Sequence, residues 1–152
     1  MIEKEQNQIG SGYIDPIIEK FFQIKIEETY SGVSYGTRVY AERLGCEESD
    51  IALREGEITN STRIFIGDFN GRNQEEIPVG MQIIFGDLDL RGSRVKHLGG
   101  LKGVVGNIDV CLDQIELIKK FKNIYCWAIW VSDLKEKRHI LDPIPGNTSI
   151  FF

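Results

Sequence analysis

Three aspartates at close spacing are the residues of this 152-residue sequence whose types could carry chemistry. Asp87 and Asp89 lie two positions apart, and Asp109 follows twenty positions after Asp89. Neighbouring carboxylates can bind a divalent cation through their oxygen atoms or exchange protons in acid–base catalysis. The same groups can also attract and orient a basic protein. Which chemistry is available depends on the elements that position the three side chains.

Cysteine and histidine offer no competing site. The sequence has three cysteines and two histidines, namely Cys46, Cys111, Cys126, His97 and His139. A structural zinc site needs about four soft ligands at close spacing, and these residues are widely separated. An odd number of cysteines without a Cys-x-x-Cys motif does not describe a disulfide framework. We expect free thiols, no metal and no cofactor; a Cys–His catalytic pair stays open, although no local motif supports it.

An internal repeat of twenty residues organises the second half of the chain. The segments 86–105, 106–125 and 126–145 align without a gap. Their shared apolar columns are Leu88, Ile108 and Ala128; Leu90, Val110 and Trp130; Val95 and Ile115; Leu98 and Ile118; Leu101 and Phe121; and Val104 and Ile124. An earlier copy fits residues 62–85 if Ile64 and Ile66 take the first two columns and four residues are inserted later. Such a repeat favours a structure built from stacked units.

Each unit contains two periods. Its start alternates apolar and polar residues, which predicts a strand, and its remainder is apolar at every third residue, which suits 3₁₀ helix or extended chain. A unit this short buries its apolar side only by stacking on its neighbours. The pattern Leu88-x-Leu90 followed by Val95-x2-Leu98-x2-Leu101 resembles the short leucine-rich repeats of bacterial proteins.

The resemblance covers about 62–145 and implies an α/β fold, a short leucine-rich-repeat-like solenoid with a parallel sheet. It departs from the family in one respect, because Gly92 and Leu112 stand where an asparagine usually follows the strand. The alternative is a chance near-repeat within an ordinary α/β domain.

The N-terminal part differs in charge from the repeat. Residues 1–61 hold 12 acids and 6 bases, whereas residues 62–152 hold 11 acids and 12 bases. We expect a flexible tail over 1–12, a small helical cap over 13–61 that covers the first repeat, and a C-terminal tail over 146–152. Asp15–Pro16 predicts a helix start, the alternation over 22–26 suggests a strand, and Gly45 predicts a helix end. A separate functional domain is the alternative for 13–61.

Strand alternation assigns the outward face of the predicted sheet. If Leu88 and Leu90 point into the core, Asp87 and Asp89 point outward. The predicted outward residues, taken strand by strand, are Arg63 and Phe65, Asp87 and Asp89, Asn107 and Asp109, and Trp127 and Ile129. In leucine-rich repeats this face is the one that partners use, so the resemblance implies a partner-binding surface. Its residue type makes Trp127 a candidate hot spot of that surface. The alternative is a solvated face without a partner.

Composition restricts the class of partner. The formal net charge is −5, which argues against direct binding of nucleic acid or an anionic membrane. The lysines at 119, 120 and 122 suit a solvent-facing surface, and the glycines near 100 lack the motif of a phosphate loop. No apolar run reaches the roughly 18 residues of a transmembrane helix, and the polar N-terminus does not have the pattern of a signal peptide, so we expect a cytoplasmic protein.

These observations favour a non-enzymatic inhibitor that binds a basic partner. In size and charge the chain is similar to bacterial immunity proteins, which neutralise toxins that are often nucleases with basic clefts; phage-encoded inhibitors of defence enzymes are similar too. A metal-binding protein or hydrolase using the three aspartates is one alternative, although an exposed sheet face gives little desolvation to raise a carboxyl pKa. A structural or scaffold repeat protein is another.

Overall fold

The computed structural model describes residues 11–132 and 149–151, and it is a mixed α/β structure with two parallel sheets. This confirms the predicted α/β class and the predicted parallel pairing. Sheet A consists of β1 (Ile51–Ala52), β2 (Ile64–Ile66), β4 (Ile83–Phe85) and β6 (Gly103–Val104). Sheet B consists of β3 (Phe69–Asn70), β5 (Leu88–Asp89), β7 (Asn107–Cys111), β8 (Ala128–Ser132) and β9 (Ser149–Phe151).

Helical segments make up the rest of the regular structure. The α-helices are α2 (Ser11–Ser31), α3 (Thr37–Leu44) and α4 (Ile115–Ile118). The 3₁₀ helices are η1 (Glu48–Asp50), η2 (Glu55–Glu57), η3 (Leu112–Gln114) and η4 (Lys119–Asn123). Within the described ranges, no helix is both long enough and apolar enough to cross a bilayer.

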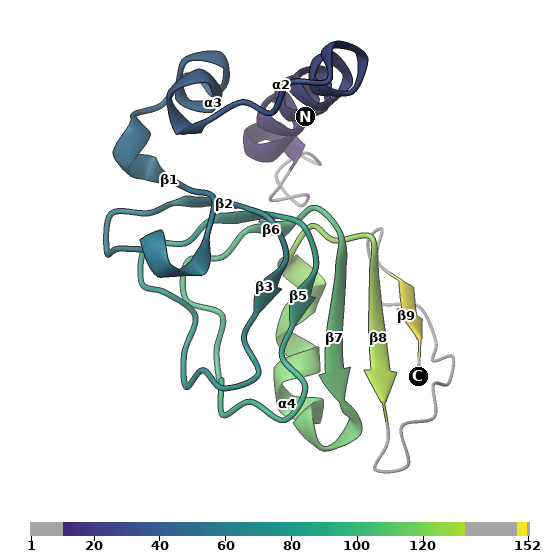
Figure 1. Cartoon of the computed structure of the whole chain (residues 1–152). Helices are drawn as coiled ribbons and strands as arrows, with labels where there is room; N and C mark the ends of the chain where they lie inside the picture. The colour runs from purple at the N-terminus through teal and green to yellow at the C-terminus, as the bar shows by residue number, and fades with distance from the viewer. Residues whose placement is uncertain (1–10, 133–148, 152) are drawn as a thin grey trace.

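The chain passes through the two sheets in turn, and Figure 1 shows this path. A strand of sheet A leads through a sharp corner into a strand of sheet B, and a return segment then carries the chain back to sheet A. We call one such passage a coil. One column of sheet B pairs Phe69 with Leu88, Leu88 with Ile108, and Ile108 with Ile129. Measured along this column, each coil is one residue longer than the coil before it.

Glycine recurs at the corner because adjacent backbones approach closely there. A Cβ atom on Gly86 would overlap the carbonyl oxygen of Gly67 and lie 2.9 Å from the backbone nitrogen of Asp68. A Cβ atom on Gly106 would lie 2.5 Å from the carbonyl oxygen of Gly86. These distances leave no room for a side chain, so the corner requires glycine in consecutive coils.

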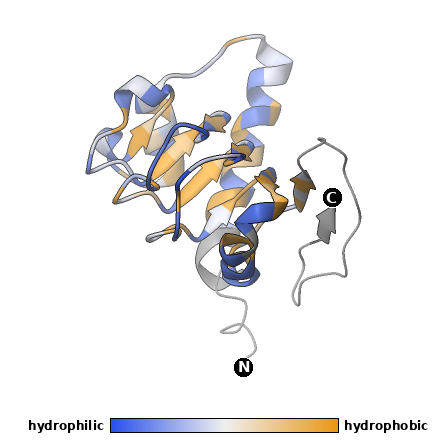
Figure 2. Cartoon of the chain, turned by 90° about the horizontal axis from the view of Figure 1, so that it is seen from below, coloured by the Kyte–Doolittle hydropathy of each residue, from blue (hydrophilic) through white to orange (hydrophobic). Residues whose placement is uncertain are grey.

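Two apolar clusters hold the structure together. The first lies inside the coils and contains the inward side chains of both sheets, such as Phe65, Leu88 and Ile108. The second lies between the outer side of sheet A and the helices, where the rings of Phe21 and Phe85 stack with centroids 3.9 Å apart. Figure 2 shows that the strands are mostly hydrophobic and the connecting loops mostly hydrophilic.

The helix near the N-terminus differs from its prediction. Helix α2 begins at Ser11, so Pro16 lies inside it, and it continues to Ser31 through the region 22–26 that alternation assigned to a strand. The buried residues Ile18, Phe21 and Ile24 lie three apart, which places them on one side of a helix. The strand prediction was therefore wrong. The helix end at Gly45 is confirmed: its φ is 81° and its N–H donates to the carbonyl of Ala41.

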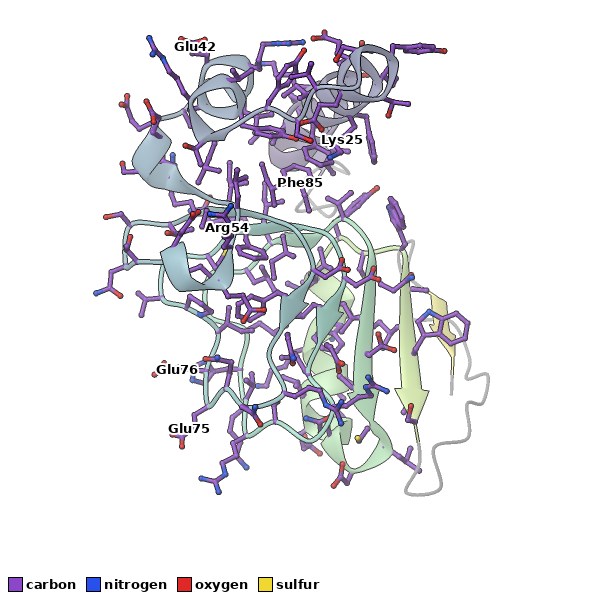
Figure 3. All side chains as sticks on the ribbon, viewed as in Figure 1. Lys25, Glu42, Arg54, Glu75, Glu76 and Phe85 are labelled. Atoms are coloured by element: carbon purple, nitrogen blue, oxygen red, sulfur yellow. The ribbon has the colours of Figure 1, made fainter. Side chains whose placement is uncertain are left out.

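The helices cover a face of sheet A rather than only the first strand. Their cluster includes Ile64, Phe85, Val105 and Tyr125, which belong to four successive coils. The edge of the core at β1 is instead closed by Ala52 and Ile58, from the end of the same N-terminal segment. In Figure 3 the side chain of Phe85 lies between sheet A and the helical layer. The helices thus form a third layer.

The chain ends fall partly outside the described residues. Residues 1–10, most of the predicted flexible tail, lie outside them, as does 133–148, which includes the end of the third repeat copy. Within the predicted tail 146–152, the backbone of Ser149–Phe151 forms strand β9 and pairs with β8. Sheet B therefore extends one strand further than the repeat analysis predicts.

Candidate functional site

The candidate site is the outward side of sheet B, which we call the polar face. Its members are Asp68, Asn70, Asp87, Asp89, Arg91, Asn107, Asp109 and Trp130, and Trp127 lies at the corner that leads into the last of these strands. Neighbouring parallel strands bring the side chains of one column close together. The pairing of Asn70, Asp89, Asp109 and Trp130 gives one column, and Asp68, Asp87 and Asn107 give the column before it.

The first column is a ladder of hydrogen bonds between coils. The backbone N–H of Asp87 donates to Oδ1 of Asp68 at 2.9 Å, and the N–H of Asn107 donates to Oδ1 of Asp87 at 2.8 Å. Each of these aspartates thus accepts a hydrogen bond from a backbone N–H of the next coil, beside the glycine corner. One carboxylate oxygen of each residue has this structural role, and the side chains stay exposed.

In the second column an arginine offsets the carboxylates. The guanidinium of Arg91 donates to both carboxylate oxygens of Asp89, at 3.0 and 2.8 Å. Burial raises the pKa of Asp89, but the hydrogen bonds from Arg91 and the positive charges of Arg91 and Arg72 outweigh it, so the pKa lies below its usual value. The hydrogen bond to Asp89 is likewise the main reason that the pKa of Arg91 is raised, and the charge of Asp109 contributes.

Like charges at this spacing repel each other unless a counter-charge lies between them. Arg91 supplies that counter-charge to two neighbouring strands. Together with Arg72, whose charge also acts on Asp89, the polar face has four aspartates and two arginines, so its net charge is still negative.

Two residues predicted on this face are buried instead. Phe65 is 2% exposed and Ile129 is 0% exposed, and both belong to the core inside the coils. Ile129 pairs with Ile108 because the last coil is one residue longer than the repeat offset, which moves each side chain of β8 to the opposite face from the one predicted. Ala128 therefore does not share the core column of Ile108, and Trp130, predicted in the core, pairs with Asp109 on the polar face.

Arg63 also lies away from the polar face. It precedes β2 in sheet A, and its guanidinium forms an ion pair with Asp50 at 3.1 Å. The first repeat copy was aligned on Ile64, but Ile64 pairs with Ile83 in sheet A, whereas Phe69 pairs with Leu88. The outward residues of the first strand of sheet B are therefore Asp68 and Asn70.

A signal in the sequence identifies these missed residues. Gly67-Asp68-Phe69-Asn70 recurs as Gly86-Asp87-Leu88-Asp89 and again as Gly106-Asn107-Ile108-Asp109. Aligned on this motif, the first copy is one residue shorter than the second and needs no insertion. The apolar columns gave a worse alignment because the strands of both sheets begin with similar apolar residues.

Trp127 is the exposed apolar residue of this region. Its side chain is 51% exposed, as predicted, and its backbone N–H donates to the carbonyl of Gly106 at the corner. Trp130 is partly buried and lies farther along the same strand region. An indole ring beside a carboxylate ladder can supply apolar contact area within a charged surface.

The described residues offer no arrangement for metal chemistry. Among them, no group of three histidine, cysteine, aspartate or glutamate side chains could hold a metal ion. The three cysteines are free thiols, and burial is the main cause that raises the pKa of Cys46. Asp89 uses both carboxylate oxygens, and Asp87 uses Oδ1, for the hydrogen bonds described above.

Comparisons with known proteins give no assignment. No family model matches the chain, and neither the curated proteins nor the solved structures yield a match.

Proposed function

We propose that the protein is a non-enzymatic, protein-binding inhibitor, and that its partner is a basic toxin or enzyme domain of the nuclease type. In this proposal it acts as an immunity protein in the cytoplasm, and its polar face covers the partner's basic surface. The regular stacking of coils in sheet B, strand beside parallel strand, supports the further proposal of a short leucine-rich-repeat-like solenoid.

One observation carries the proposal: a half-exposed tryptophan lies at the corner where a row of carboxylates begins, on a sheet face that no described helix covers. Trp127 is 51% exposed, and Asp68 and Asp87 are exposed near the same corner. Tryptophan is enriched at the energetic centre of protein interfaces. The net charge of the face favours association with a positively charged partner and accelerates encounter.

The geometry of the carboxylates adds to this argument. Asp87 and Asp89 are held by hydrogen bonds to the backbone of Asn107 and to the guanidinium of Arg91. Side chains that are already ordered lose less conformational entropy when a partner binds. Lysine or arginine of the partner can therefore meet the carboxylates without the cost of fixing them first.

The experiment is native mass spectrometry of the full chain co-expressed with the product of the adjacent gene, followed by titration calorimetry. Trp127→Ala and Asp109→Lys test the face without removing the ladder bonds of Asp87. We expect each to weaken the complex by about tenfold or more. Thermal melts of each variant check that the fold is retained.

Matched controls lie outside the polar face. Tyr30→Ala removes an aromatic side chain that is 88% exposed on α2, and Asp113→Lys makes the same charge change in η3. Both should leave the affinity within about twofold, because rim and distant charges contribute little. Equal effects of Asp109→Lys and Asp113→Lys, or a complex unaffected by Trp127→Ala, would remove the polar face as the binding site.

A further inference from the structure

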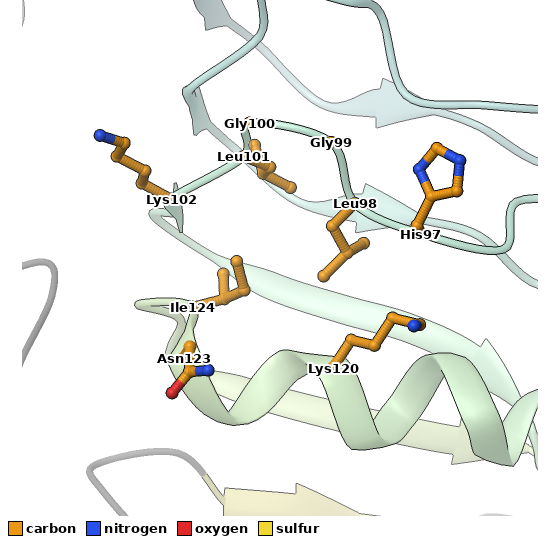
Figure 4. Close-up of a pocket in the computed structure, with 9 residues that line it drawn as sticks. All are labelled: His97, Leu98, Gly99, Gly100, Leu101, Lys102, Lys120, Asn123 and Ile124. Carbon is orange, nitrogen blue, oxygen red and sulfur yellow. The ribbon is translucent and has the colours of Figure 1, made fainter.

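A groove runs across the back of the molecule, on the side of the coils away from the polar face. It lies between the return segment of one coil and η4 of the next. Its walls and floor are formed mainly by His97, Leu98, Leu101, Lys102, Lys120 and Ile124. Figure 4 shows His97 and Lys120 at one end of this back groove and Lys102 at the other.

The groove exists because consecutive return segments differ in conformation. Residues 90–102 return without a helix, whereas the following return contains η3, α4 and η4. Figure 4 shows the loop through Gly99 and Gly100 beside the helical segment, with the side chains of Leu98 and Ile124 directed into the space between them. Because the loop and the helical segment differ in shape, they do not pack closely against each other, and the groove lies between them.

The floor of the back groove is apolar and its rim is basic. Leu98, Leu101 and Ile124 are 6%, 4% and 7% exposed and supply the floor. Two lysines, Lys102 and Lys120, line the groove together with His97, and none of its lining residues is acidic. The wall segments 96–102 and 119–124 hold three further lysines that do not line it. Lys119, outside the groove lining, forms an ion pair with Glu116, with atoms 3.3 Å apart. This surface is opposite in charge to the polar face.

We infer that the back groove binds an acidic peptide segment that also carries apolar side chains. Carboxylates of the peptide would pair with the lysines of the rim, and an apolar side chain would cover the floor. Charge complementarity selects an anionic occupant, and the leucine and isoleucine floor selects an apolar group on the same chain. This site is independent of the proposed inhibitor function.

Nucleic acid is the other polyanion to consider. Proteins that bind single strands stack bases on several aromatic side chains, whereas His97 is the one ring among the residues that line the back groove, and no phenylalanine, tyrosine or tryptophan lines it. The net charge of −5 over the whole chain also disfavours a long polyanion. A short acidic peptide meets neither objection, because it contacts only the basic segments and their apolar floor.

The test is fluorescence anisotropy with the full chain and three labelled probes. The first is an octapeptide of alternating glutamate and leucine, the second replaces each leucine by serine, and the third is single-stranded oligouridylate. We expect the first peptide to bind, the second to bind at least about fivefold more weakly, and raised salt to weaken both. Absence of binding by the first peptide, or tighter binding of the RNA, would overturn the assignment.

A matched pair of variants locates the site. Lys120 lines the groove, whereas Lys122 is exposed on the same 3₁₀ helix but does not line it. Lys120→Glu should weaken the glutamate–leucine peptide about tenfold, and Lys122→Glu should weaken it less than about threefold. Thermal melts should match between the two variants, because both side chains are exposed. Equal losses of affinity for the two variants would mean that the positive charge of the region attracts the peptide from a distance, and they would exclude the groove as its binding site.

Discussion

The outer faces of the two sheets differ in composition although one repeating coil builds both. On sheet A the outward side chains are apolar, among them Ile64, Ile83 and Phe85, and the helices bury them. On sheet B the outward side chains include Asp68, Asp87 and Asp89, and no helix described in the structure covers them. Side chains alternate between the two faces in the same way in both sheets. The type of the outward residues, apolar in sheet A and polar in sheet B, therefore decides which sheet the helices cover.

The difference in composition implies different roles: the covered face of sheet A stabilises the fold, and the polar face of sheet B is the proposed binding surface. Apolar surface removed from water contributes roughly 25 cal/mol per Å², so the covered face of sheet A is expected to hold much of the stability. The polar face gains only modest net energy from its hydrogen bonds and ion pair, because these groups also interact with water. Substitutions on the two faces should therefore have effects of very different size.

The largest effect is expected where the helices meet sheet A. Phe85 is 4% exposed and its ring stacks on Phe21 at an interplanar angle of 13°. Phe85→Ala would leave a cavity between the layers and should lower the free energy of unfolding by about 4 kcal/mol. Urea denaturation followed by circular dichroism measures this loss. Tyr30→Ala is the control, since Tyr30 is 88% exposed and its removal should cost less than about 0.5 kcal/mol. Similar losses for the two variants would contradict the importance of the covered face.

The next effect is expected at the corner that joins the two faces. Gly86→Ala would place a methyl group against the backbone of Gly67 and Asp68, so the coils would have to move apart. We expect a loss of about 3 kcal/mol in the free energy of unfolding, measured by the same denaturation. Gly56→Ala is the control because a Cβ there meets no atom within 4 Å. A Gly86→Ala protein as stable as Gly56→Ala would show that the corner does not need glycine.

Part of this architecture could be predicted from the sequence. The alternation around Leu88 and Ile108 and the twenty-residue offset correctly place Asp89 beside Asp109 in adjacent parallel strands. The exposure of Trp127 was also predicted. These features depend on local periodicity, which a single sequence records directly.

The helical layer could not be inferred from the repeat, because it depends on contacts between distant segments. One signal was present: Ile83, Ile84 and Phe85 form a continuous apolar run, as expected of a parallel strand buried on both faces. The error at Phe65 has a different cause. Both sheets have similar apolar strands, and only the glycine–aspartate motif distinguishes the strand that follows the corner from the strand that precedes it.

A smaller effect is expected on the polar face. Asp87→Ala removes the acceptor for the backbone N–H of Asn107, and the loss should be about 1 kcal/mol because the exposed donor can turn to water. Asp87→Asn keeps an oxygen acceptor and should retain most of the stability. Urea denaturation of both variants measures the difference. If alanine and asparagine are equally destabilising, the charge of Asp87 matters more than its hydrogen bond.

The smallest effect concerns the ion pair between Asp89 and Arg91. Because the pKa of Asp89 is lowered in the folded state, its carboxylate stabilises the fold above its unfolded pKa of about 3.9. This contribution decreases as the pH falls through the lower folded value, where the carboxylate takes up a proton. Partial exposure of both side chains limits it to about 0.5 kcal/mol.

Asp89→Asn isolates this contribution. We expect the variant to be less stable than the unsubstituted protein by about 0.5 kcal/mol at pH 7, and the difference to disappear near pH 2.5. Denaturant midpoints at both pH values measure it, with Phe85→Ala as the control whose deficit should persist at low pH because it involves no titrating group. A deficit of Asp89→Asn that is the same at both pH values would mean that the shape of the side chain, and not its charge, holds Arg91 on the polar face.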